Sequence, residues 1–517
     1  MLYPGTYADR TPARIAAVLA DTGETLTYGE LEDRSVRLAN TLRAAGLRPG
    51  DCVALLTENN LRAFEVYWAA LRSGFYITAI NRSLTPPETA YIVDDSGAAA
   101  LIVSGATPEI TATAETLATM TPGVRLRLAF DGPVAGYDSY EDTLAAASPV
   151  RPDDQPHGMP MLYSSGTTGF PKGVQPPLPP YRIGDVRGEP MLRMVNASFG
   201  IDENTVYLSP APIYHAAPLR WSACVQGHGG TVVMLRRFDA AAVLAAIAKY
   251  RVTHGQFVPT MLVRLLQLPG EVRAAADVSS LRCAIHAAAP CPVEVKQRMI
   301  DWWGPILTEY YSNTEGTCMT MVDSADWLKH PGTVGRSIIG TLHVCDDTGA
   351  ELPPGQVGAL YGERDTVPFV YHNDPGKSAA AQHPDHPTWT TAGDVGYLDE
   401  DGFLYLTDRK AFTIISGGVN IYPQEIENAL TLHPAIHDIA VIGLPHADLG
   451  EAVTAFVQPA AGVTPGPELA EQILDFARER IARFKMPRAV HFVDELPRTE
   501  TGKLIKRELR QRYAPQS

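Results

Sequence analysis

Short apolar segments alternate with longer helical segments through the first part of this chain. Residues 28–45 repeat apolar side chains with helical periodicity, and Gly46 provides a stop signal. Residues 51–56 form a short apolar run, residues 61–74 a second helical segment, and residues 98–103 another buried strand. Parallel strands need a crossover, which is usually a helix. The alternation therefore predicts a layered α/β architecture with largely parallel sheets.

The chain is too long, at 517 residues, for one compact core. Residues 393–406 predict a hairpin with its turn at 399–402, and a further segment of roughly 100 residues follows, enough for one small domain. We therefore predict a large N-terminal domain over 1–408 and a small α+β C-terminal domain over 409–517. Within the smaller domain, residues 439–443 are strand-like and residues 471–484 are helix-like.

The charge balance and the cysteines narrow the class of protein. The chain carries 43 Lys and Arg against 58 Asp and Glu, a net charge of −15, which argues against a nucleic-acid binder. No apolar run reaches membrane-spanning length, and the N-terminal residues do not resemble a signal peptide. The six cysteines are scattered and form no C-x-x-C pair, which predicts free thiols in a reducing compartment. We expect a cytoplasmic enzyme, and a homodimer stays open.

The strongest chemical signal is a loop after the apolar segment 159–163. From Tyr163 to Gly173 it reads Tyr-Ser-Ser-Gly-Thr-Thr-Gly-Phe-Pro-Lys-Gly. The glycines let backbone amides converge on an anion, and the hydroxyls and lysine add donors. The glycine spacing and the residue after Lys172 exclude a Walker A loop. We expect a triphosphate to bind here, through Ser164, Ser165, Gly166, Thr167, Thr168, Gly169 and Lys172.

This loop resembles the phosphate loop of the adenylate-forming superfamily, which includes acyl-CoA synthetases, luciferases and peptide-synthetase adenylation domains. Further segments match the family in the same order over nearly the whole chain. The resemblance implies a large N-terminal domain, a mobile C-terminal domain, and ATP, Mg²⁺ and coenzyme A as ligands. It also implies that Thr168 and Lys172 take part in catalysis.

The segment Tyr310-Tyr311-Ser312-Asn313-Thr314-Glu315-Gly316 resembles the part of the family that closes over the nucleotide. The resemblance implies that Tyr311 stacks on adenine, that Thr314 binds the α-phosphate, and that Glu315 holds Mg²⁺ together with Thr168. A hard carboxylate oxygen suits Mg²⁺ beside phosphates. Glu309, just before this segment, and Ala288, in the small-residue turn 286–290, are also expected in the nucleotide site.

Three later segments continue the resemblance. Asp394 matches the family's ribose-binding aspartate, with Arg409 as a second ribose contact, although Ala392 stands where the family usually has Thr. Gly417 and Gly418 match the glycine strand beside the pantetheine tunnel. The family usually has a charged hinge pair where this chain has Ala411-Phe412, so domain rotation is expected to use different contacts.

Lys503, in Pro-Arg-Thr-Glu-Thr-Gly-Lys near the C-terminus, matches the family's catalytic lysine. A carboxylate that attacks the α-phosphorus of ATP meets like charge, and two unit charges about 4 Å apart repel by roughly 4 kcal/mol at an effective dielectric of about 20. Cationic groups must offset this repulsion. Glu315-bound Mg²⁺, Lys172 and Lys503 would supply them.

The only information on which acid the chain uses comes from the residues expected to line the acyl pocket. The pocket segments carry His215, Trp221, Phe257 and Met261, and no recognised motif places Arg or Lys there to pair a second carboxylate. An apolar tail, fatty or aryl, is therefore expected. His215 is either a contact to the acyl group or thiol, or a structural histidine.

These features favour an acyl-CoA synthetase that forms an acyl-adenylate and then a thioester, releasing pyrophosphate and AMP. Alternatives are an adenylation enzyme that passes its acyl group to a carrier protein or another acceptor, and a non-catalytic relative that binds nucleotide or acyl groups. A peptide-synthetase module is disfavoured because Phe238-Asp239 does not match the expected pocket pattern. A fatty-acyl-AMP ligase would need an insertion near the domain junction, and luciferase-like oxidation is a minor option.

Overall fold

The computed structural model describes residues 2–164, 171–187, 190–409, 412–446, 448–498 and 504–513, without the side chains of residues 164, 190, 408 and 409. Its backbone divides into two compact units. Unit 1 contains Met1–Gln256, Gly270–Ala284 and Pro368–Ala379. Unit 2 contains Phe257–Pro269, Ile285–Val367 and Ala380–Ser517.

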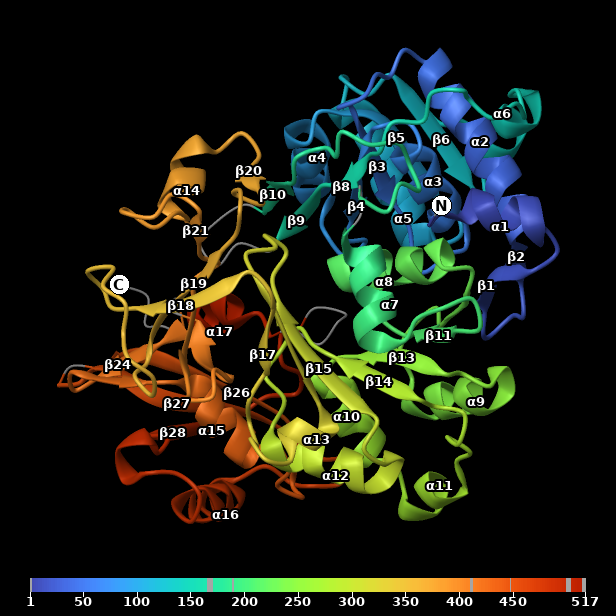
Figure 1. Ribbon diagram of the computed structural model, residues 1–517. Helices are drawn as coiled ribbons and strands as arrows, with labels where there is room; N and C mark the ends of the chain where they lie inside the picture. The colour runs from blue at the N-terminus through green and yellow to red at the C-terminus, as the bar shows by residue number, and fades with distance from the viewer. Residues whose placement is uncertain are drawn as a thin grey trace. The chain divides into compact units, whose positions relative to one another are not determined.

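Unit 1 contains a six-stranded, fully parallel sheet in the order β7-β6-β5-β3-β4-β8. Its strands are β3 (Cys52–Leu56), β4 (Tyr76–Ile80), β5 (Ala98–Ser104), β6 (Leu126–Phe130), β7 (Asp138–Ser139) and β8 (Met159–Pro160). The connecting helices contact the sheet (Figure 1) and are α3 (Arg62–Leu71), α4 (Pro86–Asp95), α5 (Pro108–Met120) and α6 (Tyr140–Ala146). The strand–helix alternation expected from the sequence is confirmed here.

A second group of strands in unit 1 runs β13-β11-β12-β1-β2, parallel except for the edge strand β2. Their bounds are β1 (Ile15–Leu19), β2 (Thr25–Thr27), β11 (Val206–Ser209), β12 (Thr231–Met234) and β13 (His254–Phe257). The helices of this part are α1 (Pro4–Arg10), α2 (Tyr28–Ala44), α7 (Pro190–Phe199), α8 (Ala216–Gly227), α9 (Ala240–Tyr250) and α11 (Gly270–Ala275). A small antiparallel sheet contains β9 (Leu162–Ser164), β10 (Lys172–Gln175) and β20 (Val370–Tyr371).

Unit 2 is mainly antiparallel, whereas largely parallel sheets were expected and the sequence predicted antiparallel pairing only for the hairpin over 393–406. Strands β15 (Leu307–Ser312), β16 (Met319–Asp323) and β17 (Arg336–Ile339) pair in order. A separate sheet contains β18 (Thr341–Cys345), β19 (Gly358–Glu363), β21 (Trp389–Thr390), β22 (Asp394–Leu398) and β23 (Leu404–Arg409). Strands β22 and β23 confirm the expected hairpin. The accompanying helices are α10 (Pro259–Leu266), α12 (Val293–Trp303) and α13 (Ser324–Trp327).

The C-terminal part of unit 2 has its own sheet and core. The order is β25-β24-β27-β26, with β28 paired to β27. The strands are β24 (Ile414–Ser416), β25 (Val419–Ile421), β26 (Ile436–His446), β27 (Gly450–Pro459) and β28 (Ala489–Phe492). The helices are α15 (Pro423–Leu430), α16 (Pro467–Arg478) and α17 (Lys506–Tyr513). One buried cluster includes Ile426, Val441 and Ile473, so strand and helix side chains pack together.

The apolar run 159–163, which precedes the predicted phosphate loop, forms two strands in different sheets, β8 and β9. One local expectation was wrong in extent. The expected helix over 471–484 begins earlier, at Pro467, and ends at Arg478. A proline at its first turn supplies the start that apolar periodicity alone had not located.

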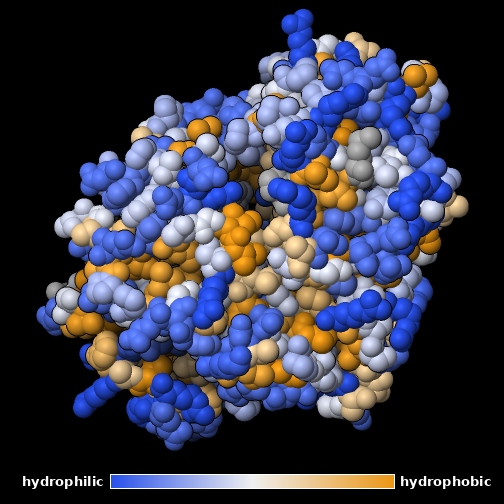
Figure 2. Space-filling view, in the orientation of Figure 1, coloured by the Kyte–Doolittle hydropathy of each residue, from blue (hydrophilic) through white to orange (hydrophobic). Residues whose placement is uncertain are grey.

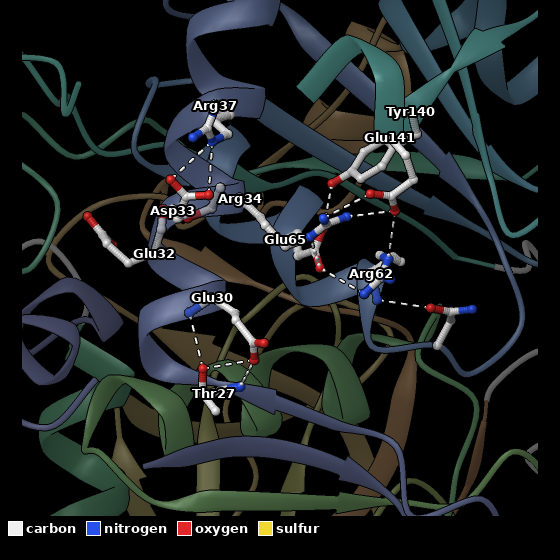
Figure 3. A network of polar contacts seen from close by, with 12 residues as sticks. Thr27, Glu30, Glu32, Asp33, Arg34, Arg37, Arg62, Glu65, Tyr140 and Glu141 are labelled. Atoms are coloured by element: carbon white, nitrogen blue, oxygen red, sulfur yellow. Dashed lines mark hydrogen bonds and ion pairs between the residues drawn. The ribbon is translucent and has the colours of Figure 1, made fainter. Parts of the chain in front are cut away.

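A buried charge network joins α2, α3 and α6 in unit 1 (Figure 3). The Glu65 side chain is fully buried, with its carboxylate 2.8 Å from Arg34 Nε and 3.2 Å from Arg62 Nη1. Tyr140 donates its hydroxyl to the same carboxylate at 2.8 Å. On the outer side, Glu141 binds Arg34 with its side chain 48% exposed. The network fixes three helices around one carboxylate.

Figure 2 shows how hydrophilic and hydrophobic residues are distributed over one face of the molecule. Hydrophilic residues cover most of this face, and hydrophobic residues lie in smaller groups between them. Such mixing is ordinary. Among the described residues, no helix combines the length and apolar character needed to cross a membrane.

Candidate functional site

The predicted phosphate loop lies between β9 and β10. These strands pair antiparallel, with Ser164 opposite Lys172. Lys172 Nζ lies 4.8 Å from the centre of the Tyr371 ring, also in unit 1, which is within cation–π range. Ser165, Gly166, Thr167, Thr168 and Gly169 lie outside the described residues, as does the side chain of Ser164. The described strands therefore bring the two ends of the loop together.

Tyr311, near the end of β15, and Asp394, at the start of β22, meet directly. The Tyr311 hydroxyl donates to Asp394 Oδ2 at 2.6 Å. Burial, followed by the nearby Asp394 carboxylate, raises the pKa of Tyr311 well above its ordinary value, so the phenol stays protonated. Asp394 also pairs with Arg409 across the β22–β23 ladder. Unit 2 thus gathers the residues expected at adenine and ribose.

A short turn carries Thr314 and Glu315. Gly316 N–H donates to the Asn313 carbonyl at 3.1 Å, and Asn313 Nδ2 donates to Thr317 Oγ1 at 2.8 Å. Arg364 Nη1 donates to the Gly316 carbonyl at 2.9 Å. This bonding holds the backbone in place while Thr314 and Glu315 remain partly exposed. Asn313 and Arg364 were not predicted from the sequence.

The Glu315 carboxylate has the donor chemistry that Mg²⁺ prefers. No group of three or more His, Cys, Asp or Glu suited to a metal is found in the described parts of the chain. Mg²⁺ usually takes one or two carboxylates and completes its shell with substrate phosphates and water. A single partly exposed carboxylate fits that pattern.

Ala288 follows β14 (Cys283–His286) in the expected adenine turn. Its φ of 76° lies in the left-handed region, which non-glycine residues seldom adopt. Such strain costs on the order of 1–3 kcal/mol and concentrates at binding sites. The next residue but one is Pro290, which also restricts this turn. The backbone at 286–290 is therefore held in an unusual conformation.

Glu309 lies in the interior rather than at the turn. It is 4% exposed, and its carboxylate is 2.6 Å from Nζ of Lys296, a fully buried residue of α12. His286 Nε2 lies 3.6 Å from the same carboxylate. Burial and Lys296 lower the pKa of His286 well below 6.5, so this imidazole is neutral. The Glu309 side chain links α12 to β15, one residue before Tyr310.

Lys296 was missed by sequence reasoning, although a signal was available. It occupies the apolar face of its helix together with Met299, Ile300 and Trp303. A lysine in that register is almost never buried unless it is paired. The pattern therefore called for a buried acidic partner, but only the fold could identify Glu309 as that partner.

The residues expected in the acyl pocket fall in both units. In unit 1, His215 is the N-cap residue of α8, and Trp221 in the same helix is buried with its ring centre 4.8 Å from that of Phe199. In unit 2, Phe257 is buried with its ring centre 5.4 Å from that of Trp303, and Met261 is buried in α10. Within its own unit, each aromatic residue except His215 is a core residue.

Gly417 and Gly418 form the two-residue turn between β24 and β25. Their φ values of 59° and 80° are both positive, and Ser416 pairs with Val419 across the turn. Two successive positive φ angles are typical of a type I′ hairpin, which favours glycine. The glycines therefore have a conformational role whatever ligand lies nearby.

Lys503 lies outside the described residues, but both ends of its segment are described. Arg498 and Leu504 form an isolated antiparallel bridge, and Ile505 N–H donates to the Pro497 carbonyl at 2.8 Å. Arg498 Nη2 donates to Asp438 Oδ1 at 2.7 Å, which ties the segment to β26. The ends of the lysine-bearing segment are thus anchored to the C-terminal sheet.

Comparison with known proteins identifies relatives over nearly the whole chain. Residues 6–370 match the model of the AMP-binding enzyme family, and residues 425–503 match the AMP-binding enzyme C-terminal domain. A feruloyl-CoA synthase from an Amycolatopsis species is 35% identical over 96% of both chains. A fatty acid–[acyl-carrier-protein] ligase from Streptomyces coeruleorubidus is 33% identical over 96% of this chain and 93% of its own.

Solved structures agree with this relationship. The crystal structure of ATP-bound MatB from Rhodopseudomonas palustris superposes with a TM-score of 0.81, 31% identity and 99% coverage of both chains. The mixed α/β fold, with a large N-terminal part and a separate C-terminal domain, is confirmed. Family models, relatives and fold all agree, and the chain belongs to the AMP-binding enzyme family of adenylate-forming enzymes.

Proposed function

We propose that this chain is an ATP-dependent acyl-CoA synthetase that activates a fatty or aryl carboxylic acid. The observation that carries the proposal is the 2.6 Å hydrogen bond between Tyr311 and Asp394. It joins two segments far apart in sequence, one expected at adenine and the other at ribose. One relative is a feruloyl-CoA synthase and another is a ligase of fatty acids, which supports the same reaction class.

Two successive displacements make up the reaction. A carboxylate oxygen of the acid attacks the α-phosphorus of ATP, and pyrophosphate leaves with its bonding electron pair. The thiol of coenzyme A then attacks the acyl carbonyl carbon, loses its proton, and expels AMP. In both steps the protein positions its substrates and offsets charge.

The chain's own groups match these tasks. Asp394 accepts hydrogen bonds from the ribose, Tyr311 stacks on the base, and Lys172 and Lys503 approach the phosphates as cations. Thr314 donates to the α-phosphate. Glu315, with Thr168 as a second ligand, would hold Mg²⁺, which would supply further positive charge next to the phosphates.

No cysteine nucleophile is needed, and the cysteines do not suit one. All six thiols are free, and five are buried. Burial raises the pKa of Cys52 to about 11 and that of Cys318 to about 12, so neither is a thiolate near neutral pH. Direct transfer of the acyl group to an external thiol fits this chemistry, and free thiols fit a reducing compartment.

We further propose a domain boundary between residues 408 and 409, so that Lys503 belongs to the C-terminal domain. The separate sheet and the buried cluster around Ile426 and Val441 support an independent C-terminal domain. Ala411 lies outside the described residues, and Phe412 contacts Lys506, whose Nζ lies 5.4 Å from its ring centre. A hinge at Ala411-Phe412 would therefore use contacts other than those of the charged pair that is usual in the family.

A second candidate function keeps the first step and changes the acceptor. The Streptomyces relative transfers fatty acids to an acyl carrier protein, at an identity close to that of the feruloyl-CoA synthase. Acyl-adenylate formation followed by transfer to a carrier thiol is therefore the alternative.

Acid-dependent exchange of labelled pyrophosphate into ATP tests the first step. We expect exchange with at least one acid from a panel of fatty, aryl and amino acids, and loss of exchange in Asp394→Ala. Lack of exchange across the whole panel would contradict the proposed activity. Adding coenzyme A or a carrier protein to the active acid then identifies the acceptor by AMP release.

A further inference from the structure

Asn59 makes three hydrogen bonds to distant backbone groups of unit 1. It follows β3 and is 3% exposed. Its Nδ2 donates to the carbonyls of Ala211 at 3.0 Å and Leu235 at 2.7 Å. Its Oδ1 accepts from Ile213 N–H at 2.7 Å. Both donor hydrogens and the acceptor of this amide are therefore used, and all three bonds cross to another part of the unit.

These bonds join the carboxyl ends of strands in two different sheets. Ala211 and Ile213 lie between β11 and α8, and Leu235 directly follows β12. Strands β11 and β12 are parallel, while β3 belongs to the six-stranded parallel sheet. Ligands of α/β proteins bind outside the carboxyl ends of such strands. Asn59 thus bonds to the loops after β11 and β12, and a shift of these loops would change the contacts to a substrate bound at the carboxyl ends of the strands.

The segment that Asn59 holds is residues 210–215, which we name the gate segment. His215 N–H donates to the Pro212 carbonyl at 3.2 Å, so the backbone turns just before α8. Tyr214 and His215 follow immediately, with ring centres 4.3 Å apart. The bond from Ile213 N–H to Asn59 fixes the Pro212–Ile213 peptide, one residue before Tyr214.

We propose that Asn59 is a positioning residue for acid binding, acting through the gate segment on Tyr214 and His215. The proposal rests on the proposed function and on the alternative in which His215 contacts the acyl group. Removing the amide leaves two buried carbonyls and one N–H without their partner. The gate segment then moves, and the acid binds less well, while the nucleotide contacts of unit 2 are untouched.

The next residue offers a matched control. Asn60 is also 3% exposed, but its Nδ2 donates to Glu58 Oε1 at 2.8 Å and to Asp131 Oδ2 at 2.6 Å. Its Oδ1 accepts from Arg62 N–H at 2.9 Å. Asn60→Ala therefore removes an amide of equal burial, with the same number of hydrogen bonds but none to the gate segment.

Steady-state kinetics of the purified full chain separates the two variants. We expect Asn59→Ala to raise KM for the acid about tenfold, because a small displacement of a group that positions the substrate weakens its productive binding. KM for ATP should stay at the wild-type value, and Asn60→Ala should change neither KM. Equal rises in acid KM for the two variants, or a rise in ATP KM matching that for the acid, would overturn the proposal.

Hydrogen–deuterium exchange of the apo protein gives a readout that does not depend on activity. Peptides covering 209–219 should exchange faster in Asn59→Ala than in wild type, and at the wild-type rate in Asn60→Ala. Unchanged exchange in Asn59→Ala would reject the positioning role even if wild-type activity is found. Faster exchange combined with an inactive wild type would keep the link and reject the proposed function. If Asn59→Ala does not fold, Asn59→Ser takes its place in both measurements.

Discussion

At the scale of single residues, the hydrogen bond from the Tyr311 hydroxyl to Asp394 is expected to affect KM for ATP. This bond orients the carboxylate proposed to bind ribose. Tyr311→Phe keeps the ring for stacking and removes only this bond. A hydrogen bond to a charged group is worth about 1.5–3 kcal/mol, so we expect KM for ATP to rise about 10-fold or more. KM for the acid should not change, and a rise confined to the acid would contradict the assignment.

His286 predicts how stability depends on pH. The unfolded chain protonates this imidazole below 6.5, whereas burial and Lys296 keep it neutral in the folded chain. Below that pH the unfolded state binds more protons, so the free energy of unfolding falls as the pH is lowered. Burial likewise lowers the pKa of His254, which acts in the same direction.

Urea unfolding at about pH 7.5 and about pH 5.5 measures this dependence. We expect wild type to lose stability at the lower pH and His286→Gln to lose less. His437→Gln, at an exposed position, serves as the control and should follow wild type. A slope in His286→Gln as steep as that of wild type would show that His286 does not contribute.

At the scale of elements, the network in Figure 3 allows a comparison of two carboxylates that share Arg34 and Arg62. The Glu65 side chain is 0% exposed and that of Glu141 is 48% exposed. Glu65→Gln leaves Arg34 and Arg62 without their buried counter-charge, which should cost about 3–5 kcal/mol of unfolding free energy. Glu141→Gln should cost less than about 1 kcal/mol, because water screens an exposed pair.

Chemical denaturation of both variants tests the pair. Equal losses would mean that burial does not set the strength of this network. If Glu65→Gln is too unstable to purify while Glu141→Gln behaves as wild type, the stated order still holds. The network joins α2, α3 and α6, so its loss should loosen these three helices together.

At the scale of the whole molecule, Lys503, the proposed catalytic lysine, is expected to contribute more to adenylate formation than to thioester formation. Lys503→Ala should greatly reduce pyrophosphate exchange, because the charge that offsets carboxylate–phosphate repulsion is lost. Thioester formation from a supplied acyl-adenylate should be much less affected. Equal losses in both assays would contradict the role of Lys503 in adenylation.

The domain order and many local elements were readable from the residues alone. The capping box of Thr27 and Glu30 and the positive φ of Gly46 bound α2 close to the predicted limits. The Gly417-Gly418 pair, which the resemblance placed in a glycine strand, forms a tight turn instead. These features depend on neighbours a few residues away, which is why periodicity, caps and turn chemistry report them.

Within each unit, other polar contacts join segments that are separated in the sequence. Lys296 pairs with Glu309, Asn59 bonds to the gate segment, and Arg364 holds the turn at Gly316. No periodicity specifies which buried donor meets which acceptor. The motifs proposed to carry the chemistry, from the phosphate loop to the terminal lysine, are encoded in local order. The partners that hold them in place follow from packing, because a buried polar group must find its counterpart wherever the fold brings one within reach.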